Sequence, residues 1–171
     1  MYVMNDEKTH RAEIEDAIRF AAKHLDGAKD LKKPVLTHSI RVGMDLMSRG
    51  YDTDIVIGGI LHDILEDTDV DRAGIEAGFG TAVADIVERC TKNEDIEDKF
   101  ERREDVVSRS AQALDSALVK SADILDNYRY YKALDDENGM EYCQSNAGFM
   151  KKHASSYEPD PLLLEVFELA Q

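Results

Sequence analysis

The chain contains no tryptophan, only two cysteines and only three prolines in 171 residues. The two cysteines, Cys90 and Cys143, form no Cys-x-x-Cys pair and cannot build the disulfide framework of a small secreted protein. We therefore expect buried or neutral thiols in a reducing compartment. With 33% charged and 43% hydrophobic residues, the composition is that of a folded protein and excludes disordered or collagen-like chains.

Long apolar runs are also absent from the sequence. The longest one, residues 55–61, is far shorter than the ~20 residues that a membrane helix needs. The N-terminus is polar and lacks the apolar segment of a signal peptide. We therefore expect a cytoplasmic protein with no membrane partner, and the length predicts a single domain over residues 1–171.

Basic residues are scarce relative to acidic ones. The 21 Lys and Arg face 36 Asp and Glu, which gives a net charge of −15. A field of this sign repels polyanions, so a nucleic-acid partner is not expected. A small anionic ligand is compatible with this charge only where a metal ion or a local group of Lys and Arg reverses the sign inside one pocket. The sequence leaves the oligomeric state open.

Alternating strand patterns are missing, whereas apolar residues recur at helical spacing along the whole chain. We therefore predict an all-α fold, a single multi-helix bundle. Charges of both signs fill residues 93–109, which indicates either a solvated helix face or a mobile connection. The predicted helices cover about 6–25, 34–50 with Pro34 in the first turn, 53–67, a short helix ending at Gly78 or Gly80, then 81–91, 115–134, 140–154 and 161–170.

Four ionisable residues gather at the end of the predicted central helix. His62-Asp63 is followed by Glu66-Asp67, and on a continuous helix this spacing stacks His62 over Glu66 and Asp63 over Asp67. Three carboxylates at a helix C-terminus repel one another and the helix dipole. A divalent cation would offset this repulsion most economically. The alternative is a solvated acidic helix end with a surface histidine.

Two further residues extend this group. His38 lies in an apolar helical pattern, where a single histidine is more often a hydrogen-bonded core residue than a ligand. Asp123 follows a largely apolar stretch, so its carboxylate is expected to enter the interior. Together with His62 and Asp63 they make a set of two imidazoles and two carboxylates, which can hold a transition metal in the core while leaving positions open for water and substrate.

The order of these residues resembles the HD phosphohydrolase superfamily. A histidine comes first, an adjacent His-Asp pair follows, and a distant aspartate completes the pattern. Further segments occur in the order seen in the hydrolase domain of RelA/SpoT proteins, and they resemble the stand-alone small alarmone hydrolases most closely. These segments are residues 61–68, 78–87, 91–92, 98–103 and 120–129, and the resemblance covers roughly residues 10–135.

The resemblance implies a manganese-dependent hydrolase that removes pyrophosphate from the 3′ position of guanosine tetra- or pentaphosphate. Glu66 and Asp67 would orient and deprotonate the attacking water. Asn127 and Arg129 match a run in which the asparagine contacts the nucleotide. Lys99 falls where the small hydrolases have a lysine that faces the phosphates, although a solvated helix face explains it equally well. The implied metal ligands are His38, His62, Asp63 and Asp123.

The segment ahead of His38 departs from the family. Residues 27–34 contain no arginine, and in the family an arginine here packs on the guanine base. Lys32 and Lys33 can attract phosphate, but an ammonium group lacks the flat face that stacks on a base. Arg41 is suited either to a phosphate contact or to an ion pair with Asp45. Base selectivity is therefore left open.

Several functions remain compatible with the sequence. Another small phosphorylated nucleotide would suit the same metal centre, and Fe²⁺, Co²⁺ or Zn²⁺ would suit the same ligands as Mn²⁺. A non-catalytic nucleotide-binding regulatory module would keep the ligands without turnover. An interaction protein that covers a basic partner would use only the acidic surface.

Overall fold

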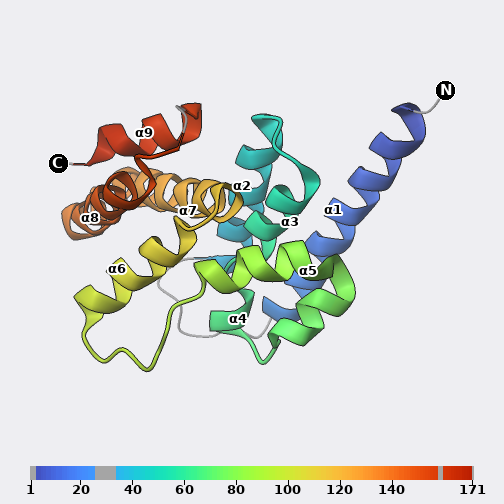
Figure 1. Cartoon of the computed structure of the whole chain (residues 1–171), viewed down its shortest axis with the longest axis horizontal. Coiled ribbons are helices and arrows are strands. Elements are labelled where there is room, and N and C mark those ends of the chain that lie inside the picture. The colour runs from blue at the N-terminus through green and yellow to red at the C-terminus, as the bar shows by residue number, and fades with distance from the viewer. Residues whose placement is uncertain (1–2, 26–33, 158–159, 171) are drawn as a thin grey trace. The chain divides into compact units, whose positions relative to one another are not determined.

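The computed structural model describes residues 3–25, 34–157 and 160–170, and within these ranges the chain forms helices and no strand (Figure 1). The all-α prediction is confirmed. Among the described residues, no helix combines the length and the apolar character needed to cross a membrane. The helices are α1 (Val3–Leu25), α2 (Val35–Ser48), α3 (Thr53–Leu61), α4 (Ile64–Asp67), α5 (Arg72–Cys90), α6 (Lys99–Ser110), α7 (Leu114–Ala133), α8 (Glu137–Ala154) and α9 (Pro161–Leu169).

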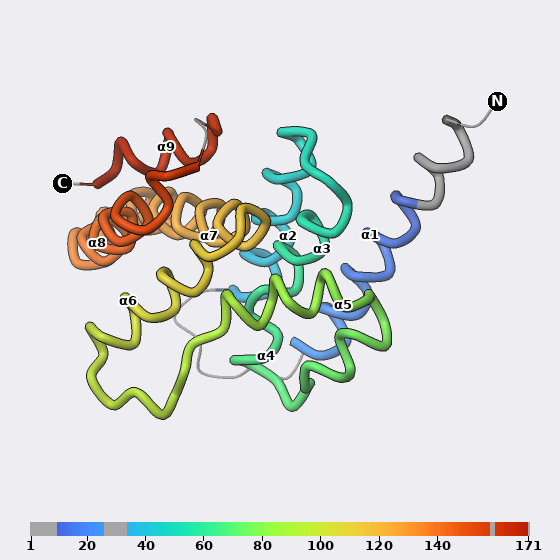
Figure 2. Tube along the Cα trace, viewed as in Figure 1, coloured from blue at the N-terminus to red at the C-terminus, as the bar shows by residue number. Residues whose placement is uncertain are grey.

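Contacts divide the chain into two compact units, residues 1–88 and residues 89–171. The first unit contains α1 to α4 and nearly all of α5, and the second contains α6 to α9, as the colour gradient of Figure 2 lets the reader follow. In the first unit α1 contacts α2, α3 and α4, and α2 lies against α3. In the second unit α8 contacts α6, α7 and α9. The single domain expected over residues 1–171 stays a prediction.

Glycines let α2 and α3 approach closely. A Cβ atom added to Gly43 of α2 would lie 2.3 Å from Cγ1 of Ile60, and one added to Gly59 of α3 would lie 2.5 Å from Cδ1 of Leu46. Such distances are well inside van der Waals contact. The two helices therefore meet at a spacing that larger residues at these positions would not allow, and this spacing sets the separation of the side chains that both helices carry.

The central helix differs from the prediction in one respect. A continuous helix was expected over residues 53–67, but α3 ends at Leu61 and α4 begins at Ile64. The backbone remains right-handed at His62 and at Asp63, where φ is −95° and ψ is −3°. The Asp63 carbonyl still accepts from the N–H groups of Glu66 and Asp67, at 3.2 and 3.1 Å. At the break the backbone stays in a right-handed helical conformation and only the hydrogen bonding changes. The apolar periodicity of the sequence therefore did not reveal it.

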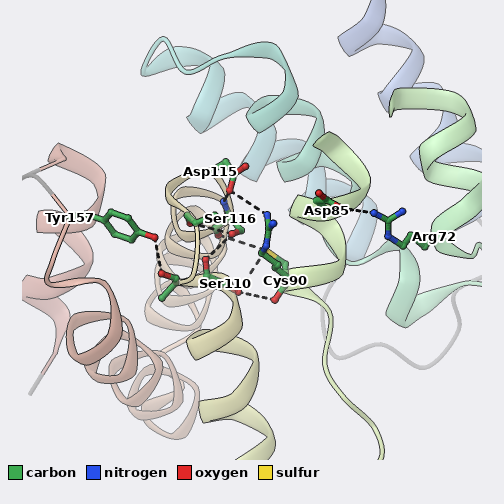
Figure 3. Close-up of polar contacts among 10 residues, drawn as sticks. Arg72, Asp85, Cys90, Ser110, Asp115, Ser116 and Tyr157 are labelled. Atoms are coloured by element: carbon green, nitrogen blue, oxygen red, sulfur yellow. Dashed lines mark hydrogen bonds and ion pairs between the residues drawn. The ribbon is translucent and has the colours of Figure 1, made fainter. Parts of the chain in front are cut away.

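The predicted boundary near Gly80 is a kink inside α5. Gly80 has a φ of 86° and a ψ of 166°, a conformation that favours glycine. Arg72, before the kink, pairs with Glu88 after it at 3.1 Å and also with Asp85, the contact drawn in Figure 3. These hydrogen bonds, with that of Glu88 the larger cause, raise the pKa of the Arg72 guanidinium. The ion pairs hold the two arms of the kinked helix together.

Side-chain caps set several helix starts in the second unit. One carboxylate oxygen of Asp98 accepts from the N–H groups of Phe100 and Glu101, at 2.8 and 2.9 Å, and so begins α6. The charged stretch 93–109 is therefore partly a helix and partly the loop that precedes it. Asp160 caps α9 in the same way, with Pro161 in its first turn, and the predicted helix over residues 161–170 is confirmed to within one residue.

A buried polar junction joins the start of the second unit to α6 and α7 (Figure 3). The Ser116 hydroxyl donates to the Ser110 carbonyl at 2.8 Å, and the Ser110 hydroxyl lies 3.1 Å from the Arg89 carbonyl. The Cys90 thiol lies 3.7 Å from the Ser116 carbonyl. Both cysteines are free and buried, as predicted.

Candidate metal centre

Two buried imidazoles face each other in the first unit. His38 comes from the first turns of α2 and is 0% exposed, and His62 directly follows α3 and is 1% exposed. Their ring centroids are 5.1 Å apart with the planes at 73°, and each offers a ring nitrogen within 4.8 Å of the other's. The surface histidine considered for position 62 is excluded, since both rings lie in the core.

The hydrogen bond of His62 fixes its neutral tautomer. Nδ1 lies 2.8 Å from the Gly59 carbonyl oxygen. A carbonyl only accepts, so Nδ1 carries the proton and donates it, and Nε2 then holds the lone pair of the neutral ring. Histidines that ligate metals commonly donate their other ring N–H to a backbone carbonyl in this way. The ring of His62 is thus orientated and protonated as a metal ligand requires.

Asp63 completes a three-residue cluster. Its Oδ1 lies 3.3 Å from Nε2 of His62, and its Oδ2 lies 3.7 Å from Nε2 of His38. Its side chain is 18% exposed, so the carboxylate is more accessible to solvent than the two buried imidazoles. Two imidazoles and a carboxylate at this separation fit a divalent transition metal. The structure therefore brings together three of the predicted ligands.

The carboxylates that follow lie in α4. Glu66 and Asp67 are both half-buried, one turn beyond Asp63. A hydrogen bond of 2.7 Å from the Thr68 hydroxyl to the Ile64 carbonyl closes this short helix. The residues predicted to activate water thus directly follow a predicted ligand, and their role stays a prediction.

The cationic residues of the first unit that were predicted to contact phosphate are Arg41, Lys32 and Lys33. Arg41 is exposed on α2. Asp45, its alternative partner, forms an ion pair with Arg49 at 3.2 Å. Lys32 and Lys33 lie outside the described residues. The choice between the two interpretations of Arg41 stays open.

Asp123 lies in the second unit, in the buried first half of α7, and is 6% exposed. The Asn127 amide donates to its Oδ1 at 2.5 Å, and the Lys120 ammonium lies 2.9 Å from its Oδ2. The expected interior position of Asp123 is confirmed. The sequence analysis missed Lys120, although a lysine one helical turn before a buried aspartate is a recognisable signal in an apolar stretch.

The remaining predicted contacts also belong to the second unit. Arg129 is half-exposed and pairs with Glu165 of α9 at 2.9 Å. Lys99 is exposed at the first residue of α6. The Asn127 contact with Asp123 shows that this asparagine orientates a predicted ligand, whereas the resemblance implied only a contact with the nucleotide.

Comparison with known proteins relates the chain to a family. The model of a family described as an HD domain matches residues 17–146. A guanosine-3′,5′-bis(diphosphate) 3′-pyrophosphohydrolase of Aquifex aeolicus is 35% identical over 124 residues, and the match covers 70% of this chain but only 18% of that protein. The chain thus corresponds to less than a fifth of that long relative.

Shorter relatives match over more of their length. The pyrophosphohydrolase MESH1 of Mus musculus is 35% identical, and the match covers 69% of each chain. The solved structure of a metazoan ortholog of SpoT, a protein that hydrolyses ppGpp, superposes with a TM-score of 0.74 over 92% of this chain, at 23% identity. A Listeria monocytogenes crystal structure superposes with a TM-score of 0.67 at 26% identity.

Proposed function

Because the chain belongs to the HD domain family, we propose that it is a metal-dependent hydrolase that removes pyrophosphate from the 3′ position of guanosine tetra- or pentaphosphate. The observation that carries the proposal is the cluster of His38, His62 and Asp63, in which the His62 tautomer is set for ligation. The names of the Aquifex and MESH1 relatives supply the substrate.

The proposed ligands are His38, His62, Asp63 and Asp123, and the proposed metal is Mn²⁺. Two nitrogens and two carboxylate oxygens suit this ion and leave positions for water and a phosphoryl oxygen. Asp123 is 6% exposed, and a carboxylate withdrawn from bulk water is a ligand type that divalent ions bind, which supports its inclusion.

When bound, the metal would lower the pKa of a water molecule and polarise the phosphoryl oxygen. Glu66 and Asp67, half-buried one turn beyond Asp63, would orient this water and accept its proton. General-base help of this kind is typically worth about 10²–10⁴-fold in rate.

Phosphate recognition is proposed for the cationic side chains. Lys99 and Arg41 are exposed and can meet the phosphates of a nucleotide. Lys32 and Lys33 would add positive charge ahead of His38, and Arg129 would follow Asn127 in the family's substrate-binding run. Near the site, these cations would offset the repulsion between an anionic nucleotide and the protein's net charge of −15.

The proposed compartment is the cytoplasm, and the proposed partner is the small nucleotide alone. Two free, buried thiols suit a reducing environment.

The test is pyrophosphate release from guanosine tetraphosphate by metal-stripped protein, with and without added Mn²⁺. The adenosine analogue and the common nucleoside triphosphates serve as competing substrates. Release that depends on Mn²⁺ and prefers the guanosine compound supports the proposal. Turnover of another nucleotide instead would keep the metal chemistry and replace the substrate.

Two controls make this test specific. His24→Gln removes an imidazole of α1 that is not among the proposed metal ligands. This variant should bind metal and turn over substrate like the wild type. Metal binding without turnover of any nucleotide would contradict the hydrolase and favour a regulatory module.

A further inference from the structure

A lysine is buried beside Asp123 in the second unit. Lys120 is 7% exposed, and its Nζ lies 2.9 Å from Oδ2 of Asp123, one turn further along α7. The whole stretch from Ser116 to Asp126 is buried. Lysine is almost never fully buried unless its charge is paired. Position 120 therefore holds a cation inside the protein at the carboxylate that we propose as a metal ligand.

We infer that Lys120 is a built-in competitor of the divalent ion: it neutralises Asp123 when metal is absent and weakens metal binding when metal is present. The inference rests on the proposed function, because it requires Asp123 to be a ligand. It adds a residue that sets the metal affinity of the site without binding the metal itself.

Two of the groups that contact Asp123, the Asn127 amide and the Lys120 ammonium, differ in charge. Asn127 donates to Oδ1 as a neutral amide, so it orientates the carboxylate without opposing a cation. Lys120 contacts Oδ2 and carries a full positive charge. Each carboxylate oxygen has two acceptor positions, so both contacts can persist when a metal binds. The ammonium and the divalent ion would then share one carboxylate and repel each other.

Burial makes this repulsion large enough to measure. The energy between two charges varies inversely with the effective dielectric constant, which is far lower in a protein interior than in water. The side chains of Lys120 and Asp123 are only 8% and 9% exposed, so solvent and salt screen them weakly. In the metal-free protein the same burial makes the lysine necessary, because a buried carboxylate without a nearby cation is strongly destabilising.

The decisive experiment titrates metal-stripped protein with Mn²⁺ by calorimetry at neutral pH. In Lys120→Met we expect the Kd for Mn²⁺ to fall by about tenfold or more, because the competing charge is gone. The stripped variant should melt at a lower temperature than the stripped wild type, and Mn²⁺ should raise its Tm by a larger amount. Lys120→Arg keeps the charge and should keep a Kd within about twofold of the wild type.

Lys120→Gln separates charge from positioning and serves if Lys120→Met does not fold. A glutamine amide can still donate a hydrogen bond but carries no charge, so its Kd should also fall. Lys152→Met is the matched control, because Lys152 forms an exposed ion pair with Glu104 at 2.6 Å in the same unit. The Kd of the Lys152→Met variant for Mn²⁺ should equal that of the wild type. An unchanged or weaker affinity in the neutral Lys120 variants would overturn the inference.

Asp123→Asn distinguishes this failure from failure of the proposed function. If Asp123→Asn binds Mn²⁺ as tightly as the wild type, Asp123 is not a ligand, and both the proposed ligand set and the competition fall. If Asp123→Asn loses metal while the neutral Lys120 variants gain no affinity, only the competition falls.

Discussion

The imidazole rings of His38 and His62 meet edge to face, with centroids 5.1 Å apart and planes at 73°. The two histidines belong to different parts of the first unit, one in α2 and one directly after α3, so their meeting depends on the packing of these helices. Asp63 lies within 3.7 Å of both rings. This three-residue cluster can be tested residue by residue.

Replacing Asp63 by asparagine should remove both metal and activity. The amide keeps the shape of the side chain but loses the negative charge that makes Asp63 a ligand for a divalent ion. Metal content after dialysis and Mn²⁺-dependent pyrophosphate release are the two measurements. Asp54→Asn, an exposed aspartate in the first turn of α3, is the control and should retain both. Full metal content in Asp63→Asn would remove this residue from the ligand set.

Glu66→Gln should separate binding from turnover. Glu66 follows the cluster in α4 and is proposed to accept a proton from water, so the variant should bind metal like the wild type. Its kcat should fall by about 10²–10⁴-fold, the usual contribution of a general base. The measurement pairs Mn²⁺ calorimetry with steady-state hydrolysis of guanosine tetraphosphate. Wild-type turnover in this variant would show that Glu66 does not activate the water.

Gly43→Ala should destabilise the first unit. The added Cβ would lie 2.3 Å from Cγ1 of Ile60 and 3.2 Å from the Val56 carbonyl, so α2 and α3 would have to separate. Overpacking of this kind costs about 1–3 kcal/mol in the free energy of unfolding, measured by urea titration. Gly148→Ala in α8 meets nothing within 4 Å and should stabilise by up to ~1 kcal/mol. Equal effects of the two substitutions would contradict the close packing of α2 on α3.

The sequence predicted most of the fold because its apolar residues recur at helical spacing. The predicted helix end at residue 25 and the predicted helix start at residue 161 agree with the structure, whereas the helix end predicted at Gly78 or Gly80 is a kink at Gly80 inside α5. The break between α3 and α4 escaped prediction, because the apolar pattern continues through His62 and Asp63 while only the hydrogen bonding changes.

The sequence predicted those parts of the candidate site whose residues are close together along the chain. His62, Asp63 and their downstream carboxylates are close along the chain, so helical spacing alone groups them. The tautomer of His62 was not predictable, because it depends on the position of the Gly59 carbonyl. The pairing of Arg129 with Glu165 joins residues far apart in sequence and depends on the docking of α9 against α7.

Glu104 should make the stability of the second unit sensitive to acid. Hydrogen bonds from Lys152 first, and then from His153, hold the pKa of its carboxyl below the usual range. The contribution of Glu104 to stability is therefore fully present above the pKa of an unfolded glutamate, and it is lost as the pH falls through the lower, folded pKa. In Glu104→Gln the difference in unfolding free energy from the wild type should be largest at neutral pH and shrink in acid, as measured by urea titrations across this range.

Glu141→Gln changes an exposed glutamate of α8 and is the control. A difference that stays constant with pH would show that the contacts of Glu104 do not favour its ionised form.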